Sequence, residues 1–157
     1  MDDVKDLVEK AKAGSIDLSR DEDLSIAIMN LISLEEHCYF TGVKLSNKKY
    51  FEMLESVREM RKRLMKKIVK SPEGEEWCIS KHLLAAAMRL IESGTKEQSR
   101  GSRQDAEFMF SSAFYLYSLF FAINLKLIEK DELKDPKDSR PSRFSEIVKK
   151  IVDCCKE

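Results

Sequence analysis

Apolar residues recur every three or four positions through most of the chain, and polar or charged residues fill the positions between them. This spacing is typical of amphipathic helices rather than of strands, in which apolar and polar residues alternate. Thr41–Gly42, Ser71–Pro72 and Gly94 interrupt the pattern. The pattern therefore predicts four long helices, over residues 19–40, 48–70, 72–93 and 102–130.

Residues that favour helix starts stand at the beginning of these segments. Ser19 followed by Glu22 has the form of a capping box, and Ser102 followed by Asp105 has the same spacing. Pro72 suits the first position of the third helix, because the N–H that it lacks has no intrahelical partner there. The second helix has two candidate capping residues, Ser46 and Asn47.

Short connections between long helices favour antiparallel neighbours. We therefore expect an all-α protein with one domain, an antiparallel up-down four-helix bundle with short additional helices at both ends. Its parts are a short N-terminal helix and loop (1–18), the four-helix core (19–130), a charged linker (131–141) and a C-terminal helix (142–157).

Composition supports the all-α prediction and limits the classes of function that the protein can have. Charged residues make up 36% of the chain, whereas only 5 glycines and 3 prolines occur, which favours long helices over a sheet with many turns. The 28 basic and 28 acidic residues balance, so no net charge attracts nucleic acid or an anionic membrane to the whole molecule. The cysteines, at positions 38, 78, 154 and 155, form no C-x-x-C pair, and we expect reduced thiols in the cytoplasm.

Two opposite charges interrupt apolar stripes that should face the core. Glu35 lies in the middle of the stripe of the first long helix, and Arg61 lies between Val57 and Leu64 on the second. Neither charge is stable in an apolar core without a partner, so both should be buried and hydrogen-bonded. Simple hairpin register places them about two turns apart, so a third group could complete the network. A structural pair is the favoured interpretation, and a ligand site is the alternative.

The third helix carries a possible half-site for a metal ion. Glu75, Cys78 and His82 share its narrow polar face, which also holds Arg89. A thiolate and an imidazole one turn apart can share a metal, but one helix supplies too few ligands for a complete site. We therefore expect a solvated polar face, and we expect the protein to bind no metal or other cofactor.

The segment from Arg58 to Lys70 is strongly basic, so its outer face could contact phosphates. No aromatic residue lies between the basic residues to stack on bases, which makes a solvated face the simpler interpretation. The candidate contact residues are Lys62, Arg63, Lys66, Lys67 and Lys70.

The segment from Phe108 to Leu125 contains no charged residue. Its 18 residues reach the lower length limit for a membrane span, but its serines, tyrosines and asparagine would need partners in lipid, so we expect no membrane insertion. Its apolar residues point in nearly every direction around the helix. We therefore expect a homodimer through Phe108–Leu125, or terminal helices that cover this surface within one chain.

The predicted topology is similar to that of HEPN ribonucleases and of ferritin-like metal proteins, but the motifs of both families are missing. No arginine precedes His37 or His82 by four to six residues, as in HEPN nucleases. The Glu-x-x-His motif of ferritin-like sites is absent, because Leu34 and Ile79 occupy the glutamate positions. The leading hypothesis is a non-enzymatic module for self-association or protein interaction. Binding of a small molecule or metal, and binding of nucleic acid, are the alternatives.

Overall fold

The computed structural model describes residues 18–126 and shows an all-helical chain over that range. The all-α prediction is confirmed. The predicted N-terminal helix, charged linker and C-terminal helix lie outside the described residues. The four helices are α2 (Ser19–Leu45), α3 (Lys48–Ile68), α4 (Glu76–Ser99) and α5 (Arg103–Asn124).

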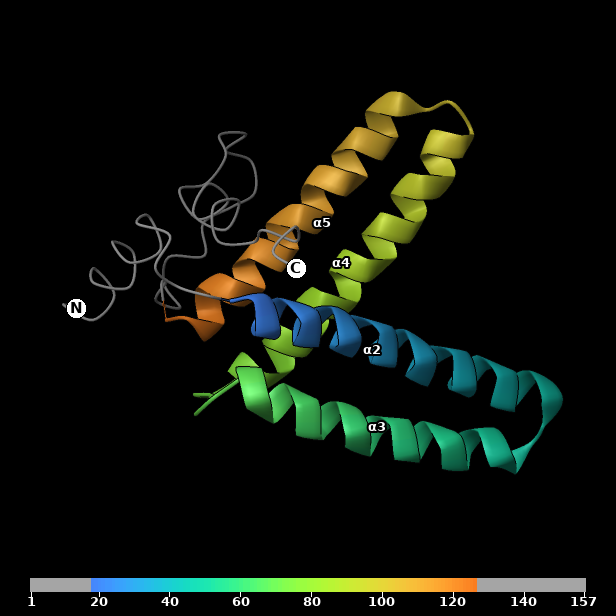
Figure 1. The fold of residues 1–157 in the computed structure, drawn as a ribbon. Coiled ribbons are helices and arrows are strands. Elements are labelled where there is room, and N and C mark those ends of the chain that lie inside the picture. Colours follow the sequence, from blue (N-terminus) through green and yellow to red (C-terminus); the bar gives the residue numbers. More distant parts are fainter. Residues whose placement is uncertain (1–17, 127–157) are drawn as a thin grey trace.

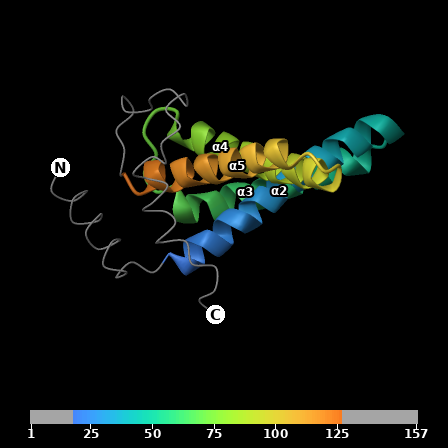
Figure 2. The ribbon, with the colours of Figure 1, turned by 90° about the horizontal axis from the view of Figure 1, so that it is seen from above.

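The helices pair as two antiparallel hairpins, α2 with α3 and α4 with α5 (Figure 1). The hairpins cross where the N-terminal half of α2 passes over the N-terminal half of α4, and their turns diverge on the same side of the crossing. Seen from above, the α2–α3 turn extends beyond the turn of the other hairpin (Figure 2). Each hairpin therefore has one end at the crossing and one end that projects from it.

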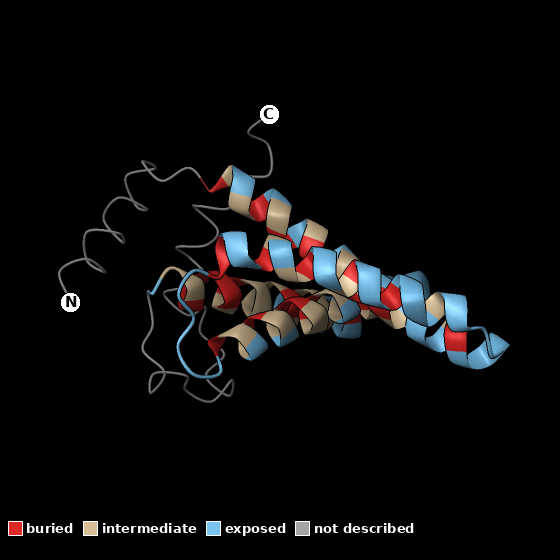
Figure 3. Cartoon of the chain, turned by 90° about the horizontal axis from the view of Figure 1, so that it is seen from below, coloured by how far each residue is buried: buried red, intermediate tan, exposed pale blue. Residues whose placement is uncertain are grey.

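The largest core cluster lies at the crossing. It combines the N-terminal half of α2, the C-terminal ends of α3 and α5, and the first half of α4. Figure 3 shows buried residues concentrated here and exposed residues over the far end of the α2–α3 hairpin. The buried members are Leu18, Ile28, Met29, Ile32, Met65, Ile68, Val69, Leu84, Ala87, Phe120 and Phe121.

Polar contacts hold the helices together around this core. Ser25 on α2 and Tyr117 on α5 share a hydrogen bond of 2.6 Å. Asn124 near the end of α5 donates to Ser80 on α4. Every buried side-chain nitrogen or oxygen among the described residues has a hydrogen-bond partner.

The predicted end of α2 near Phe40 is wrong, because the helix continues through Gly42 to Leu45. Gly42 is buried, and a Cβ built on it would lie 3.0 Å from the ring of Phe51 on α3. Gly42 therefore favours the close approach of the two helices and does not end the helix. The helix ends instead at Ser46, which has a φ of 48° in the left-handed region, a common helix ending.

Both predicted ends of α4 are also wrong. The chain cannot continue as a helix through Ser71 and Gly74, where φ is 51° and 52°, so α4 begins at Glu76 and not at Pro72. At the other end, Gly94 lies inside the helix, where a Cβ would be only 2.7 Å from the ring of Phe110 on α5. Both hairpins thus have a glycine opposite a phenylalanine near the turn.

The starts of α2, α3 and α5 lie closer to those predicted. Asn47 caps α3 by accepting a hydrogen bond from the backbone N–H of Lys49. Helix α2 includes Ser19, with Leu18 in the cap position, so the predicted Ser19 cap is wrong by one residue. Ser102 precedes α5 as predicted, and its hydroxyl donates to Asp105. Helix α5 ends at Asn124, several residues before the predicted end at 130.

Candidate functional site

Glu35 and Arg61 form a buried ion pair between α2 and α3. The residues are 9% and 4% exposed. The Nε of Arg61 donates to Glu35 Oε1 over 2.5 Å, and its Nη2 donates to Oε2 over 3.4 Å. This two-point contact fixes the relative position of the two helices in the middle of their hairpin.

A third residue completes this network. The Nε of the half-buried Arg58 donates to Glu35 Oε2 over 3.2 Å, so two guanidinium groups contact one carboxylate. The interpretation of the Arg58–Lys70 segment as a solvated face is therefore wrong for Arg58. The i, i+3 spacing of the two arginines was the sequence signal for this contact, because residues three apart lie on the same face of a helix.

The network has the features of a structural contact. Both carboxylate oxygens of Glu35 accept hydrogen bonds from arginine, and the remaining Arg61 nitrogen, Nη1, points at the Met65 sulfur over 3.6 Å. A ligand would have to displace one of these partners at the cost of leaving a buried charge unpaired. The geometry therefore gives Glu35 and Arg61 a role in holding α2 against α3.

The polar face of α4 divides into two parts. Glu75, Cys78 and His82 are exposed to solvent. Arg89 instead reaches across to α2, where its Nη2 donates to Ser33 Oγ over 2.5 Å and its Nε lies 3.7 Å from Glu36 Oε2. Within residues 18–126, no three potential metal ligands of the His, Cys, Asp or Glu type are grouped together.

The basic residues of α3 lie on its outer surface together with acids. Arg63, Lys66, Lys67 and Lys70 are exposed, and Lys62 is half-buried. The Nζ of Lys62 donates to Glu59 over 2.6 Å. This hydrogen bond and the charge of Lys62 lower the pKa of the Glu59 carboxyl. The positive face is therefore partly neutralised by acids of the same helix.

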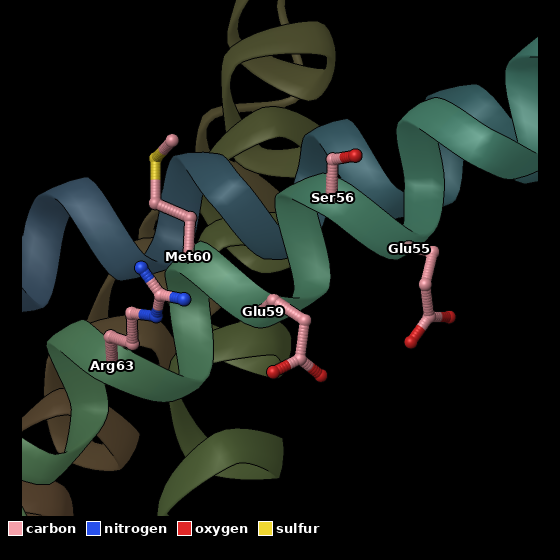
Figure 4. Close-up of a pocket in the computed structure, with 5 residues that line it drawn as sticks. All are labelled: Glu55, Ser56, Glu59, Met60 and Arg63. Atoms are coloured by element: carbon pink, nitrogen blue, oxygen red, sulfur yellow. The ribbon is translucent and has the colours of Figure 1, made fainter.

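A shallow hollow lies on the same surface. Figure 4 shows its lining side chains, all of which come from successive turns of α3. Because one helix face supplies every lining residue, the hollow is an open surface and not a cleft between elements. The lining residues are Glu55, Ser56, Glu59, Met60 and Arg63.

The apolar segment of α5 is only partly covered. Phe108 is 71% exposed, whereas Phe120, Phe121 and Ile123 are buried near the crossing. Helix α5 is long and apolar enough to cross a membrane. In its most apolar stretch of 18 residues, only 33% of the residues are buried. One such helix is weak support for a membrane span, because core helices of soluble proteins pass the same test. The half-buried large apolar residues are Met109, Phe110, Phe114, Leu116, Leu119 and Leu125.

Comparison with known proteins gives no relative. No protein-family model, no curated protein and no solved structure matches the chain. The functional argument therefore rests on the described side chains.

Proposed function

We propose that this protein is a non-enzymatic helical interaction module that forms a homodimer through α5. The observation that supports the proposal is the incomplete burial of the uncharged segment of this helix. Phe108–Leu125 contains no charged residue, yet only 33% of the residues in the most apolar 18-residue stretch of α5 are buried. Large exposed apolar surfaces on proteins commonly serve as interaction sites.

The packing of α5 explains why so much of it stays uncovered. Among the described helices, α5 packs mainly against α4. Helix α5 also meets α2 near the hydrogen bond between Ser25 and Tyr117. Burial of a large apolar side chain contributes about 1.5 to 3 kcal/mol, so covering even three of them is worth a large part of a typical stability of about 5 to 15 kcal/mol. A second copy of the chain could supply this cover, with two-fold symmetry.

The alternative is cover from within the chain. In an up-down bundle with short helices at both ends, the segments 1–17 and 127–157 would lie over α5, and the protein would be a monomer. The two arrangements differ in molecular mass in solution. We also propose a cytoplasmic location. Cys38 and Cys78 are both free thiols, and cysteines usually stay reduced in the cytoplasm.

A matched pair of substitutions tests whether α5 forms the interface. Phe108 on α5 and Phe40 on α2 are 71% and 67% exposed, so serine at either position should perturb folding little. Phe108→Ser should raise the dimer dissociation constant at least tenfold, because each dimer carries two substitutions. Phe40→Ser should leave the dissociation constant unchanged. Equal dimerisation of wild type and Phe108→Ser would place the interface elsewhere.

A further inference from the structure

The turn of the α2–α3 hairpin, residues 37–51, has a charge pattern unlike the rest of the chain. Lys44, Lys48 and Lys49 lie in this hairpin tip, and no aspartate or glutamate occurs between Glu36 and Glu52. All three lysines are exposed. In a chain with equal numbers of acidic and basic residues, the tip is therefore a local positive patch.

The same tip exposes large apolar side chains. At about 100° per residue, Tyr39, Phe40 and Val43 share one face of α2 and Leu45 lies on roughly the opposite side, so the apolar surface extends beyond one stripe. Figures 1 and 3 show that the tip projects from the crossing of the hairpins and is mostly exposed. The exposed apolar residues are Tyr39 (51%), Phe40 (67%), Val43 (56%), Leu45 (57%) and Phe51 (40%).

We propose that the hairpin tip binds peripherally to the surface of an anionic membrane. Aromatic and aliphatic side chains next to lysines suit the boundary between lipid headgroups and acyl chains, where the apolar groups enter and the lysines contact anionic headgroups. The tip needs no groove in its partner, because a lipid surface can surround a projecting end from all sides. The proposal concerns contact with one leaflet and is independent of the dimer through α5.

Two other occupants fit the tip less well. A second copy docked tip to tip would bring its own three lysines against Lys44, Lys48 and Lys49, and like charges in an interface disfavour association. A groove in another protein binds one apolar stripe of a helix, with anchors at i, i+3, i+4 and i+7. The tip carries Leu45 on the other side of α2 and Phe51 on α3 in addition to its stripe of Tyr39, Phe40 and Val43, so one groove would leave part of its apolar surface uncovered.

The nearest acids limit how deeply the tip can enter. Glu52 lies about one helical turn from the start of α3, and Glu36 lies more than two turns from the end of α2. Insertion is therefore shallow, about the 5 to 10 Å that is usual for interfacial helices. Because lysine attraction is screened by salt, binding should weaken as ionic strength rises.

Vesicle co-sedimentation of the intact protein tests the proposal. The vesicles are phosphatidylcholine alone or phosphatidylcholine mixed with phosphatidylserine. Lys48→Glu/Lys49→Glu should weaken binding to the mixed vesicles more than twentyfold, since each lysine contributes about fivefold and reversal adds repulsion. The matched control, Lys66→Glu/Lys67→Glu, reverses two exposed lysines at the other end of α3 and should have a much smaller effect.

A second pair of variants tests the apolar contribution. Val43 and Met60 are both 56% exposed, but only Val43 lies in the tip. Val43→Ser should weaken binding several-fold, and Met60→Ser should not. The proposal is overturned if the wild type does not bind the mixed vesicles, if it binds pure phosphatidylcholine equally well, or if the control variants lose binding as strongly as the tip variants. An acidic protein or a nucleic acid would then be the candidate partner.

Tryptophan fluorescence gives a readout of insertion that does not depend on the amount bound. The only native tryptophan, Trp77, lies on α4 against the core, away from the tip. In a Phe40→Trp variant, mixed vesicles should shift the emission to shorter wavelength, whereas the parent protein should show no shift. Absence of a shift in the variant while it is bound would contradict entry of the tip into the lipid.

Discussion

Arg61 on α3 contacts both carboxylate oxygens of Glu35 on α2, and this buried pair joins the two helices of the first hairpin. The pair is not symmetric in its surroundings. Glu35 has a second cation, Arg58, within hydrogen-bond distance, whereas Arg61 contacts Glu35 and the Met65 sulfur. Loss of Glu35 and loss of Arg61 should therefore lower the free energy of unfolding by different amounts.

Glu35→Leu should destabilise the protein more than Arg61→Met. The first substitution leaves the guanidinium of Arg61 buried without a carboxylate, at a cost of about 3 to 5 kcal/mol, whereas the second leaves Glu35 paired with Arg58. The double variant should be less destabilised than Glu35→Leu alone, because no buried charge is left without a partner. Urea denaturation of the three variants measures these differences. Equal costs for the two single variants would show that Arg58 does not compensate.

Gly94→Ala should destabilise the α4–α5 hairpin, although alanine favours helices by about 1 kcal/mol over glycine. The new Cβ would lie 2.7 Å from the ring of Phe110, so the ring or the helix must move. In a Phe110→Ala background the clash is gone, and the same Gly94→Ala substitution should stabilise the protein by up to about 1 kcal/mol. Thermal unfolding of the four proteins checks this change of sign.

Gly42 provides a comparison within the same chain. Its Cβ would lie 3.0 Å from the Cε1 and Cζ atoms of Phe51 and 3.2 Å from the Cβ of Tyr50, and Phe51 is 40% exposed. The ring can therefore move more easily than that of Phe110, which is half-buried. Gly42→Ala should cost less than Gly94→Ala, and a larger cost would contradict this account of the two contacts.

These two glycines also show which parts of the fold the sequence could predict. Helical periodicity was sufficient for the number and type of the long helices. It could not separate a glycine that ends a helix from one that admits a neighbouring ring, because that distinction depends on a residue of another helix. Periodicity alone therefore predicts a break at both Gly42 and Gly94.

The position of the first turn had a further consequence for Glu35 and Arg61. Their stripes predicted a polar network, but a turn starting at Thr41 placed them about two turns apart. Because α2 continues to Leu45, the pairing of the helices shifts by more than one turn and brings the two charges together. The i, i+3 spacing of Arg58 and Arg61 indicates a shared helix face, but whether the longer reach of Arg58 from the edge of the stripe ends at Glu35 depends on the position of the other helix.

The contact between Lys62 and Glu59 predicts a measurable titration. The pKa of Glu59 is lowered chiefly by the hydrogen bond from Lys62, so its carboxylate is favoured in the folded state. Its small stabilising effect should be present above the ordinary glutamate pKa of about 4.5 and lost as the pH falls through the lowered folded value. Lys62→Ala should raise the pKa of Glu59, which NMR titration of the side-chain carboxyl can follow. An unchanged pKa would show that the hydrogen bond does not persist in solution.

Sedimentation velocity of the intact wild-type chain over a range of micromolar concentrations tests the central claim most directly. Self-association through α5 should give a sedimentation coefficient that rises with concentration toward that of a compact dimer. A monomer at every concentration, with no concentration dependence, would contradict the homodimer and favour cover of α5 within one chain.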